Sequence, residues 1–252
     1  MIPFIHFERL HLPFQLFGAF LVIAVWVGSA LTHWRARELG LDKDKTSSMF
    51  LWSLLAGLVL AHAFDLVAYQ WAEGRPSLWT ILNPFAGLSS YGGFGGSLLG
   101  MFVWCKVRRE PYLPYVDSCA VGLAVAWFFG RVGCFTAHDH PGRPSGFVLA
   151  VRYPGGARHD LGLYEALLAL GVSLLFWWLA RRKQPLGVYT ILCCLLYGPA
   201  RFLLDFLRAT DVPGADPRYF GLTPGQYASL VITAVGLALI PRARREARLA
   251  AT

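Results

Sequence analysis

The sequence predicts an all-α integral membrane protein with about seven transmembrane helices. Of its 252 residues, 56% are hydrophobic and only 15% are charged, whereas about 25% charged residues is usual in a soluble protein. Aromatic residues make up 15% and include nine Trp, which suits a protein whose rings lie at the bilayer interfaces. The apolar residues gather in runs of about 20, the length that crosses a bilayer as a helix.

Seven such runs follow one another along the chain. The predicted spans are residues 12–34, 48–71, 86–105, 113–130, 162–180, 186–207 and 224–241. The third run is rich in glycine and the fourth is short. Because the sequence shows no internal repeat, low-complexity segment or soluble appendage, we expect a single polytopic membrane domain over residues 1–252.

The basic residues between the runs predict the orientation of the chain. One set of connecting segments carries 14 Lys and Arg residues: Arg35, Arg37, Lys43, Lys45, Lys106, Arg108, Arg109, Arg181, Arg182, Lys183, Arg242, Arg244, Arg245 and Arg248. The other side carries nine Arg and no Lys: Arg9, Arg75, Arg131, Arg143, Arg152, Arg158, Arg201, Arg208 and Arg218. Cytoplasmic loops are enriched in Lys and Arg, so we expect the N-terminus outside and the C-terminus in the cytoplasm.

The net charge of +8 therefore reflects membrane orientation, and we expect no nucleic acid partner. Four of the five cysteines, Cys105, Cys119, Cys193 and Cys194, lie in or beside apolar runs. They are expected to pack as small hydrophobic side chains, and no disulfide framework is indicated.

The longest outer segment is predicted to be a small extracytoplasmic loop domain over residues 131–161. Within it, FVLAVRYPGG has a strand-like pattern that leads into a Pro-Gly-Gly turn. This pattern predicts a short β-hairpin.

Several ionisable or small residues lie inside the predicted spans, where charged groups are costly and usually face a partner or a cavity. We expect His62 and Asp65 to form a buried pair, and Asp117 to anchor helix packing. In GLSSYGGFGGSLLG the spacing of Gly92, Gly96 and Gly100 predicts close helix packing.

The sixth run contains YGPARFLLDFLR. Its helical spacing places Tyr197, Arg201, Asp205 and Arg208 on one face. The alternatives are a structural Arg–Asp pair and a face that binds an anionic ligand, and the repeated positive charge favours the ligand.

A second cluster, RHDLGLYE, contains Arg158, His159, Tyr164 and Glu165 at the outer end of the fifth run. A Glu in the first turn of a helix is stabilised by the helix dipole, so Glu165 alone needs no function. Three helix ends bring Arg131, Arg158 and Arg201 toward one region with few acids. Phosphate matches the bidentate geometry of such guanidinium groups.

The stretch GRVGCFTAHDHPGRPS offers three kinds of chemistry. Cys134, His138 and His140 could hold zinc, or Cys134 could be a nucleophile with a histidine base. The third reading makes Arg131 an anion ligand and the His138–Asp139–His140 group a proton acceptor. This reading agrees with the rest of the chain, so no metal or other cofactor is expected, and Cys134 should pack near Arg131.

This stretch also resembles the signature of bacterial prolipoprotein diacylglyceryl transferases, Gly-Arg-x-Gly-Asn-Phe-x-Asn-Gly-Glu-x-x-Gly-Arg. The resemblance continues in register through GLSSYGG, RHDLGLYE, YGPARFLLDFLR and LTPGQ, over nearly the whole chain. It implies a seven-span enzyme of the bacterial inner membrane with the N-terminus outside. Such an enzyme moves the diacylglyceryl group of phosphatidylglycerol to the lipobox cysteine of a prolipoprotein signal peptide and leaves glycerol 1-phosphate. Membrane lipids would surround it.

The resemblance also implies the functional positions. Those that match the family are Arg131, His159, Tyr164, Glu165, Tyr197, Arg201 and Gln226, with Asp205 where the family has Glu. The expected phosphate and headgroup set is Arg131, Arg201, Arg158, His159, Tyr197, Asp205 and Glu165.

The chain departs from the family at five positions. Tyr91 replaces the His of the glycine motif, Cys134 and Ala137 replace Asn, Asp139 replaces the signature Glu, and Phe17 replaces a Tyr. The candidates for the proton acceptor are therefore His138, Asp139, His140 and Tyr91. The departures leave two alternatives, a related transferase that gives the lipid to another acceptor and a non-catalytic lipid-binding or lipid-transporting paralogue.

Overall fold

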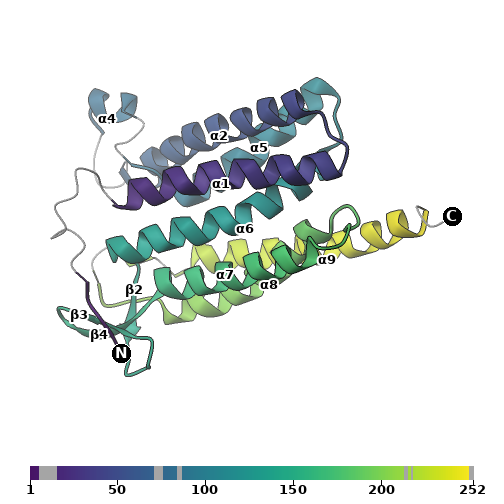
Figure 1. Cartoon of the computed structure of the whole chain (residues 1–252). Coiled ribbons are helices and arrows are strands. Elements are labelled where there is room, and N and C mark those ends of the chain that lie inside the picture. The colour runs from purple at the N-terminus through teal and green to yellow at the C-terminus, as the bar shows by residue number, and fades with distance from the viewer. Residues whose placement is uncertain (6–15, 71–75, 84–86, 213–214, 217, 250–252) are drawn as a thin grey trace. The chain divides into compact units, whose positions relative to one another are not determined.

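The computed structural model describes residues 1–5, 16–70, 76–83, 87–212, 215–216 and 218–249. These residues are mostly helical (Figure 1). They fall into two compact units, one made of Met1–Arg35 with Val116–Thr252 and one of Ala36–Tyr115. Arg9, Arg75 and the edges of the first three predicted runs lie outside the described residues.

Each predicted run corresponds to a long helix. These helices are α1 (Leu16–Glu38), α2 (Lys43–Asp65), α5 (Ser90–Arg108), α6 (Tyr112–Ala137), α7 (Leu161–Leu179), α8 (Val188–Leu204) and α9 (Pro224–Leu249). Six of them are long and apolar enough to cross a bilayer, and α5 is not among these. The predicted class, an all-α multi-pass membrane protein, is confirmed. The count of seven spans and the orientation remain predictions.

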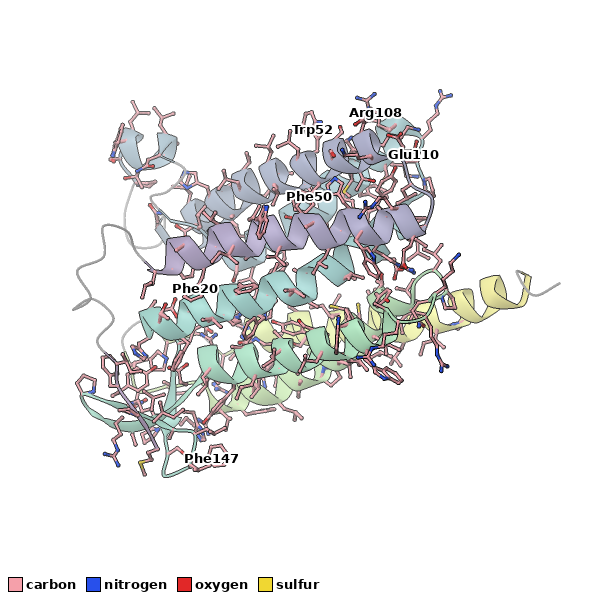
Figure 2. The ribbon with its side chains drawn as sticks, in the orientation of Figure 1. Phe20, Phe50, Trp52, Arg108, Glu110 and Phe147 are labelled. Atoms are coloured by element: carbon pink, nitrogen blue, oxygen red, sulfur yellow. The ribbon has the colours of Figure 1, made fainter. Side chains whose placement is uncertain are left out.

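The distribution of side chains is that of a protein dissolved in lipid. Large apolar side chains project outward, as Trp52 does from α2 (Figure 2), and Trp26 of α1 is 74% exposed. Charged and polar side chains such as Glu165, Asp205 and Gln226 are fully buried. Inside a bilayer this arrangement avoids placing charge against hydrocarbon.

In the unit Ala36–Tyr115, α2 packs closely along α5 (Figure 1). A Cβ atom added to Gly96 would lie 2.6 Å from the carbonyl oxygen of Ala56, and one on Gly92 would collide with the carbonyl oxygen of Leu60. Only glycine allows this approach, which confirms that the predicted ridge serves helix packing. The short π-helix η2 (Leu66–Gln70) and the helix α4 (Leu78–Leu82) follow α2.

The predicted pairing of His62 with Asp65 is wrong. The two ring nitrogens of His62 each lie 3.1 Å from a backbone carbonyl oxygen, those of Gly87 and Ile81. Asp65 instead accepts a hydrogen bond of 2.6 Å from Gln70. The carbonyl groups of the irregular segment near α4 require donors, and His62 provides one.

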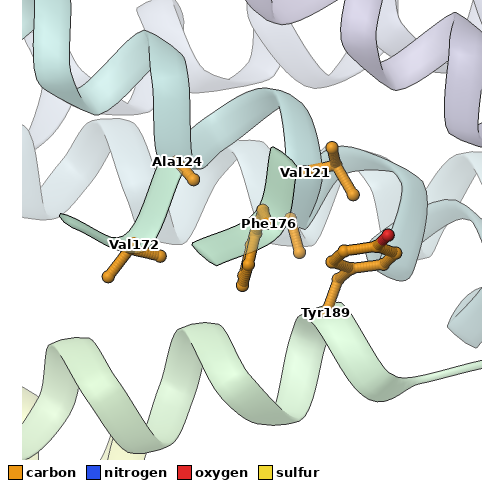
Figure 3. Packing of buried hydrophobic residues seen from close by; sticks show 6 residues of the cluster. Val121, Ala124, Val172, Phe176 and Tyr189 are labelled. Carbon is orange, nitrogen blue, oxygen red and sulfur yellow. The ribbon is translucent and has the colours of Figure 1, made fainter. Parts of the chain in front are cut away.

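In the other unit, α8 packs against both α7 and α9 (Figure 1). Its hydrophobic core joins Val121 and Ala124 of α6 to Val172 and Phe176 of α7 and to Tyr189 of α8 (Figure 3). The rings of Phe176 and Tyr189 meet edge to face at 5.0 Å, a favourable aromatic geometry.

Asp117 joins three helices, which confirms its predicted role as a packing anchor. Its Oδ2 accepts hydrogen bonds from Arg35 Nη2 at 2.8 Å and Nε at 3.2 Å. Its Oδ1 accepts from the backbone N–H and the hydroxyl of Thr190 at 3.0 and 3.2 Å. Its place in a basic block indicated that Arg35 is a loop residue, and this prediction is wrong, because Arg35 lies in α1. It is 1% exposed.

The predicted loop 131–161 begins later than expected, because α6 continues to Ala137. Arg131 and Cys134 thus belong to the last two turns of the helix. His138, with φ of +52°, adopts the left-handed conformation that commonly ends a helix.

Three strands follow α6 and form a four-stranded sheet with a strand at the N-terminus. Its strands are β1 (Ile2–Pro3), β2 (Pro141–Pro144), β3 (Val151–Tyr153) and β4 (Gly156–Asp160), in the order β1-β3-β4-β2. Strands β3 and β4 are antiparallel, with Tyr153 opposite Gly156. The predicted hairpin is therefore confirmed.

We predict that Asp117→Asn lowers the free energy of unfolding by about 3–5 kcal/mol, since it leaves the buried Arg35 charge without its counter-ion. Thermal unfolding in detergent measures this. The control is Asp44→Asn, because Asp44 is exposed on the first turn of α2. An Asp117→Asn protein as stable as this control would contradict the anchor.

Candidate active site

A buried carboxylate, Glu165, lies between two arginines. Its Oε2 lies 3.0 Å from Arg131 Nη2, and its Oε1 lies 3.4 Å from Arg201 Nε. Tyr197 also donates its hydroxyl to Oε2 at 3.3 Å. Glu165 is 0% exposed, so these contacts form away from water. They join α6, α7 and α8 at one point.

Arg131 is held from a second side by an aromatic ring. Its guanidinium lies 4.5 Å from the centre of the Trp127 ring, within the range of a cation–π contact. The Trp127 ring in turn meets Tyr197 edge to face at 5.5 Å. The plane of the Arg131 guanidinium is therefore fixed by both a charge and a ring.

Asp205 is the second buried carboxylate of the cluster, at the start of the 3₁₀ helix η3 (Asp205–Leu207). It accepts hydrogen bonds from Arg201 Nη1 at 2.5 Å and from Arg208 Nε at 3.2 Å. The hydroxyl of Thr223 also donates to it. Tyr197, Arg201, Asp205 and Arg208 thus contribute to one linked network, in agreement with their predicted common face.

Thr223 and Gln226 form a capping box at the start of α9. Gln226 Oε1 accepts from the Thr223 backbone N–H at 3.0 Å, and Thr223 Oγ1 accepts from the Gln226 backbone N–H at 3.2 Å. Gln226 Nε2 also donates to the carbonyl oxygen of Phe202 at 3.2 Å. The cap therefore ties α9 to the end of α8, where Asp205 lies.

The arginines of this cluster are balanced by carboxylates, contrary to the expectation of little counter-charge. Arg131 and Arg201 face Glu165, Arg201 and Arg208 face Asp205, and Arg208 Nη1 lies 2.8 Å from Asp216. Unpaired charges would be too costly at this depth, so the fold supplies one acid for each arginine. A guanidinium has five N–H donors, and these contacts leave some of them available.

Arg158 makes its ion pair elsewhere. Its two terminal nitrogens contact the Asp211 carboxylate at 2.9 and 2.6 Å, and one also donates to the carbonyl oxygen of Gly142. The hydrogen bonds from Arg158 hold the pKa of Asp211 below its usual value. Arg158 thus connects the sheet to the segment after α8, and its described contacts do not include the Glu165 network.

His159 lies at the end of β4, with its Nδ1 2.8 Å from the hydroxyl oxygen of Tyr164. The ring of Phe147, on the loop before β3 (Figure 2), lies 6.2 Å from it. Burial lowers the pKa of His159, which favours the neutral form of its imidazole.

The two histidines of the HDH triplet have different environments. His138 stacks on Phe4 at 4.1 Å, and its Nε2 lies 3.2 Å from the Ile5 carbonyl oxygen. Its Nδ1 lies 3.6 Å from the carboxylate of Asp160, which also accepts the Tyr153 hydroxyl at 2.7 Å. His138 is therefore part of the packing between the sheet and the N-terminal segment.

His140 is turned back toward α6. Ligand atoms of Cys134, Asp139 and His140 all lie within 4.8 Å of one another. His140 Nδ1 lies 2.9 Å from the Asp139 carbonyl oxygen. Since a carbonyl can only accept, this contact favours the tautomer with the proton on Nδ1 and the lone pair on Nε2. Burial lowers the pKa of His140, although the Asp139 carboxylate opposes this shift.

Cys134 packs near Arg131, as predicted, with its Sγ 3.9 Å from Arg131 Nη1. Tyr91 lies on α5 in the other compact unit, where its ring is 6.4 Å from that of Phe64. Its predicted role as a proton acceptor stays a prediction.

Three residues of the cluster were not anticipated from the sequence. Trp127 precedes Arg131 by four residues, one helical turn, which is a recognisable cation–π spacing. Thr223 opens a Thr-x-x-Gln pattern, a sequence signal for a capping box. Asp216 carries no comparable signal, because its contact depends on the path of the loop after α8.

The chain is similar to known proteins over most of its length. The family described as prolipoprotein diacylglyceryl transferase matches residues 5–242. A phosphatidylglycerol–prolipoprotein diacylglyceryl transferase of Nitratidesulfovibrio vulgaris is 30% identical over 245 residues, 92% of this chain and 91% of the relative. One from Campylobacter lari is 27% identical over 248 residues, 92% and 90% of the two chains. The chain, with its paired arginines in a membrane bundle, belongs to the prolipoprotein diacylglyceryl transferase family.

Proposed function

We propose that this protein transfers the diacylglyceryl group of phosphatidylglycerol to the lipobox cysteine thiol of a prolipoprotein in the bacterial inner membrane. The family match over residues 5–242 supports the reaction. The observation that carries the proposal is the contact of two buried guanidinium groups, Arg131 and Arg201, with one carboxylate, Glu165. Such a pair is suited to a phosphodiester that enters from the lipid.

The lipid phosphate binds to N–H groups that the resting contacts leave available. Glu165 keeps both guanidinium groups at the site while no phosphate is present, and the phosphate then shares them. The buried Oε1 atom of Glu165 accepts no hydrogen bond within the described residues. A hydroxyl of the phosphatidylglycerol headgroup can donate to it, which places the headgroup beside the phosphate.

The chemical step is a displacement at the carbon of the diacylglyceryl group that is bonded to the phosphate oxygen. The acceptor sulfur forms a bond to this carbon while the carbon–oxygen bond breaks, and glycerol 1-phosphate leaves with the bonding electrons. Arg131 and Arg201 stabilise the negative charge that grows on the leaving phosphate. The thiol proton passes to a base, because the thiolate is the real nucleophile.

Among the candidate bases, His140 has the geometry that suits the role. The tautomer that its Nδ1 contact favours leaves the Nε2 lone pair to accept a proton, and its neighbour Cys134 contacts Arg131. Asp139, beside it, orients the ring. His138 is held by its stack on Phe4, and Tyr91 is the alternative. Arg158, His159, Tyr197 and Asp205 complete the proposed headgroup set.

The reaction is tested with purified protein in detergent, labelled phosphatidylglycerol and a lipobox peptide. We expect a thioether-linked diacylglyceryl peptide and free glycerol phosphate. A peptide with Ser in place of the lipobox Cys is the control and should give no product. Lipid consumption without a modified peptide would indicate another acceptor, and no consumption would indicate a non-catalytic protein.

We predict that Arg131→Lys and Arg201→Lys each reduce the transfer rate, by about 10²-fold or more, the scale for loss of one donor to a developing oxyanion. A lysine retains the charge but cannot make the bidentate contact. Initial rates with saturating peptide measure the effect. The matched control is Arg152→Lys on the exposed side of β3, which should transfer normally.

Glu165→Gln is predicted to destabilise the protein by about 3–5 kcal/mol, because two buried guanidinium groups lose their common counter-ion. A bound phosphate can replace that charge. Added glycerol 1-phosphate should therefore raise the melting temperature of the variant more than that of the parent. Equal shifts in the two proteins would contradict the shared contact.

For the base, His140→Gln should lower the transfer rate by roughly 10²–10⁴-fold, the usual range for general acid–base catalysis. His138→Gln should instead lower the melting temperature with a smaller effect on the rate, since His138 packs against Phe4. A normal rate for His140→Gln together with an inactive Tyr91→Phe protein would assign the base to Tyr91.

A further inference from the structure

The end of α6 brings three metal-binding side chains together. His138 reverses the chain in the left-handed conformation, so Asp139 and His140 fold back over the last turn of the helix. A sulfur of Cys134, a carboxylate oxygen of Asp139 and a ring nitrogen of His140 then lie within 4.8 Å of one another. This set differs from the Cys134–His138–His140 set that the sequence suggested.

We propose that Cys134, Asp139 and His140 bind one Zn²⁺ ion, and that the bound ion inhibits the transferase. The binding is independent of the reaction, whereas the inhibition rests on the proposed function. Three ligands of this kind leave one tetrahedral position for water, as in open zinc sites. The transfer itself is expected to need no metal.

The donor types and their mobility fit zinc. Thiolate, imidazole and carboxylate are all common zinc ligands, and their donor atoms lie roughly 3–4 Å apart around a tetrahedral ion. The three side chains need to close by only about 1 Å to reach this geometry. The side chains of Asp139 and His140 are 45% and 26% exposed, so they can move, while Cys134 is fixed on the helix.

The charges near the site favour a dication. Binding converts the Cys134 thiol to a thiolate and releases its proton, so the ligands carry two negative charges with Asp139. Arg131 stabilises this thiolate, because its Nη1 lies 3.9 Å from Cys134 Sγ. The charge of Arg131 does not repel the ion fully, because Glu165 already neutralises it at 3.0 Å.

The ion inhibits because it would bind the ring nitrogen of His140 that is proposed to act as the base. A zinc-bound His140 has no lone pair for the acceptor thiol proton, and the ion fixes Asp139 as well. Exhaustive chelation should therefore leave the transfer rate undiminished, and added zinc should lower it. A metal-requiring enzyme would show the opposite response.

Zinc binding is measured on the chelator-treated, purified protein in detergent. Calorimetric titration with ZnCl₂ should show one site, and Co²⁺ should give the near-ultraviolet absorption of a thiolate–cobalt bond. Cys134→Ser should weaken zinc binding by about tenfold or more, since it removes one of three ligands. Cys119→Ser, a half-buried cysteine of the same helix, is the control and should bind normally. Normal zinc binding by His138→Asn would exclude the alternative ligand set, Cys134–His138–His140.

The transfer assay with added ZnCl₂ then tests the inhibition. The parent should lose most of its activity and recover it with chelator, while Cys134→Ser should be active and resistant to zinc. Absence of zinc binding by the parent, or equal binding by Cys134→Ser, would overturn the site. Zinc binding with an unchanged rate would overturn the inhibition alone, and binding without any transfer activity would count against the proposed function, not against the site.

Discussion

The structure of the larger unit depends on one buried carboxylate, Glu165, shared by two guanidinium groups. Without it, Arg131 and Arg201 would be two like charges held together in a medium of low dielectric constant, where their repulsion is strong. With it, α6, α7 and α8 are joined at the point where a lipid phosphate is proposed to bind. The interaction that holds the helices together also keeps the arginines in place for the substrate.

Helix α8 is fixed at both ends by buried acids. Near its start, Thr190 donates to Asp117, which also binds Arg35 of α1. At its other end, Asp205 binds Arg201 and receives the hydroxyl of the Thr223 cap. Apolar side chains cannot supply this specificity in a bilayer, because lipid tails are as apolar as the side chains. Polar contacts inside the bundle therefore decide how these helices pair.

Local patterns in the sequence predicted the elements well. The long apolar runs, the glycine ridge of α5, the β3–β4 hairpin and the common face of Tyr197 and Asp205 all depend on residues close together in the chain. The resemblance to the family located Arg131 and Arg201 as well.

Contacts between distant segments could not be predicted in this way. The helix dipole was a sufficient local explanation for Glu165, while its partners lie 34 residues before it and 36 after it in the chain. The loop after α6 was expected to begin at Arg131, yet Trp127 and Glu165 accommodate this arginine within the helix. The left-handed turn at His138 separates the two histidines of the triplet. It contains no glycine, the residue that would have indicated such a turn in the sequence.

The central claim is that Arg131 and Arg201 act as one unit on one phosphate. A double-mutant cycle on the transfer rate tests it most directly, with the two single lysine variants and the double variant measured at the same lipid content. Groups that act together are strongly non-additive, so the double variant should be within about tenfold of the slower single variant. Effects that multiply in the double variant would show that the two arginines act independently and would contradict the shared site.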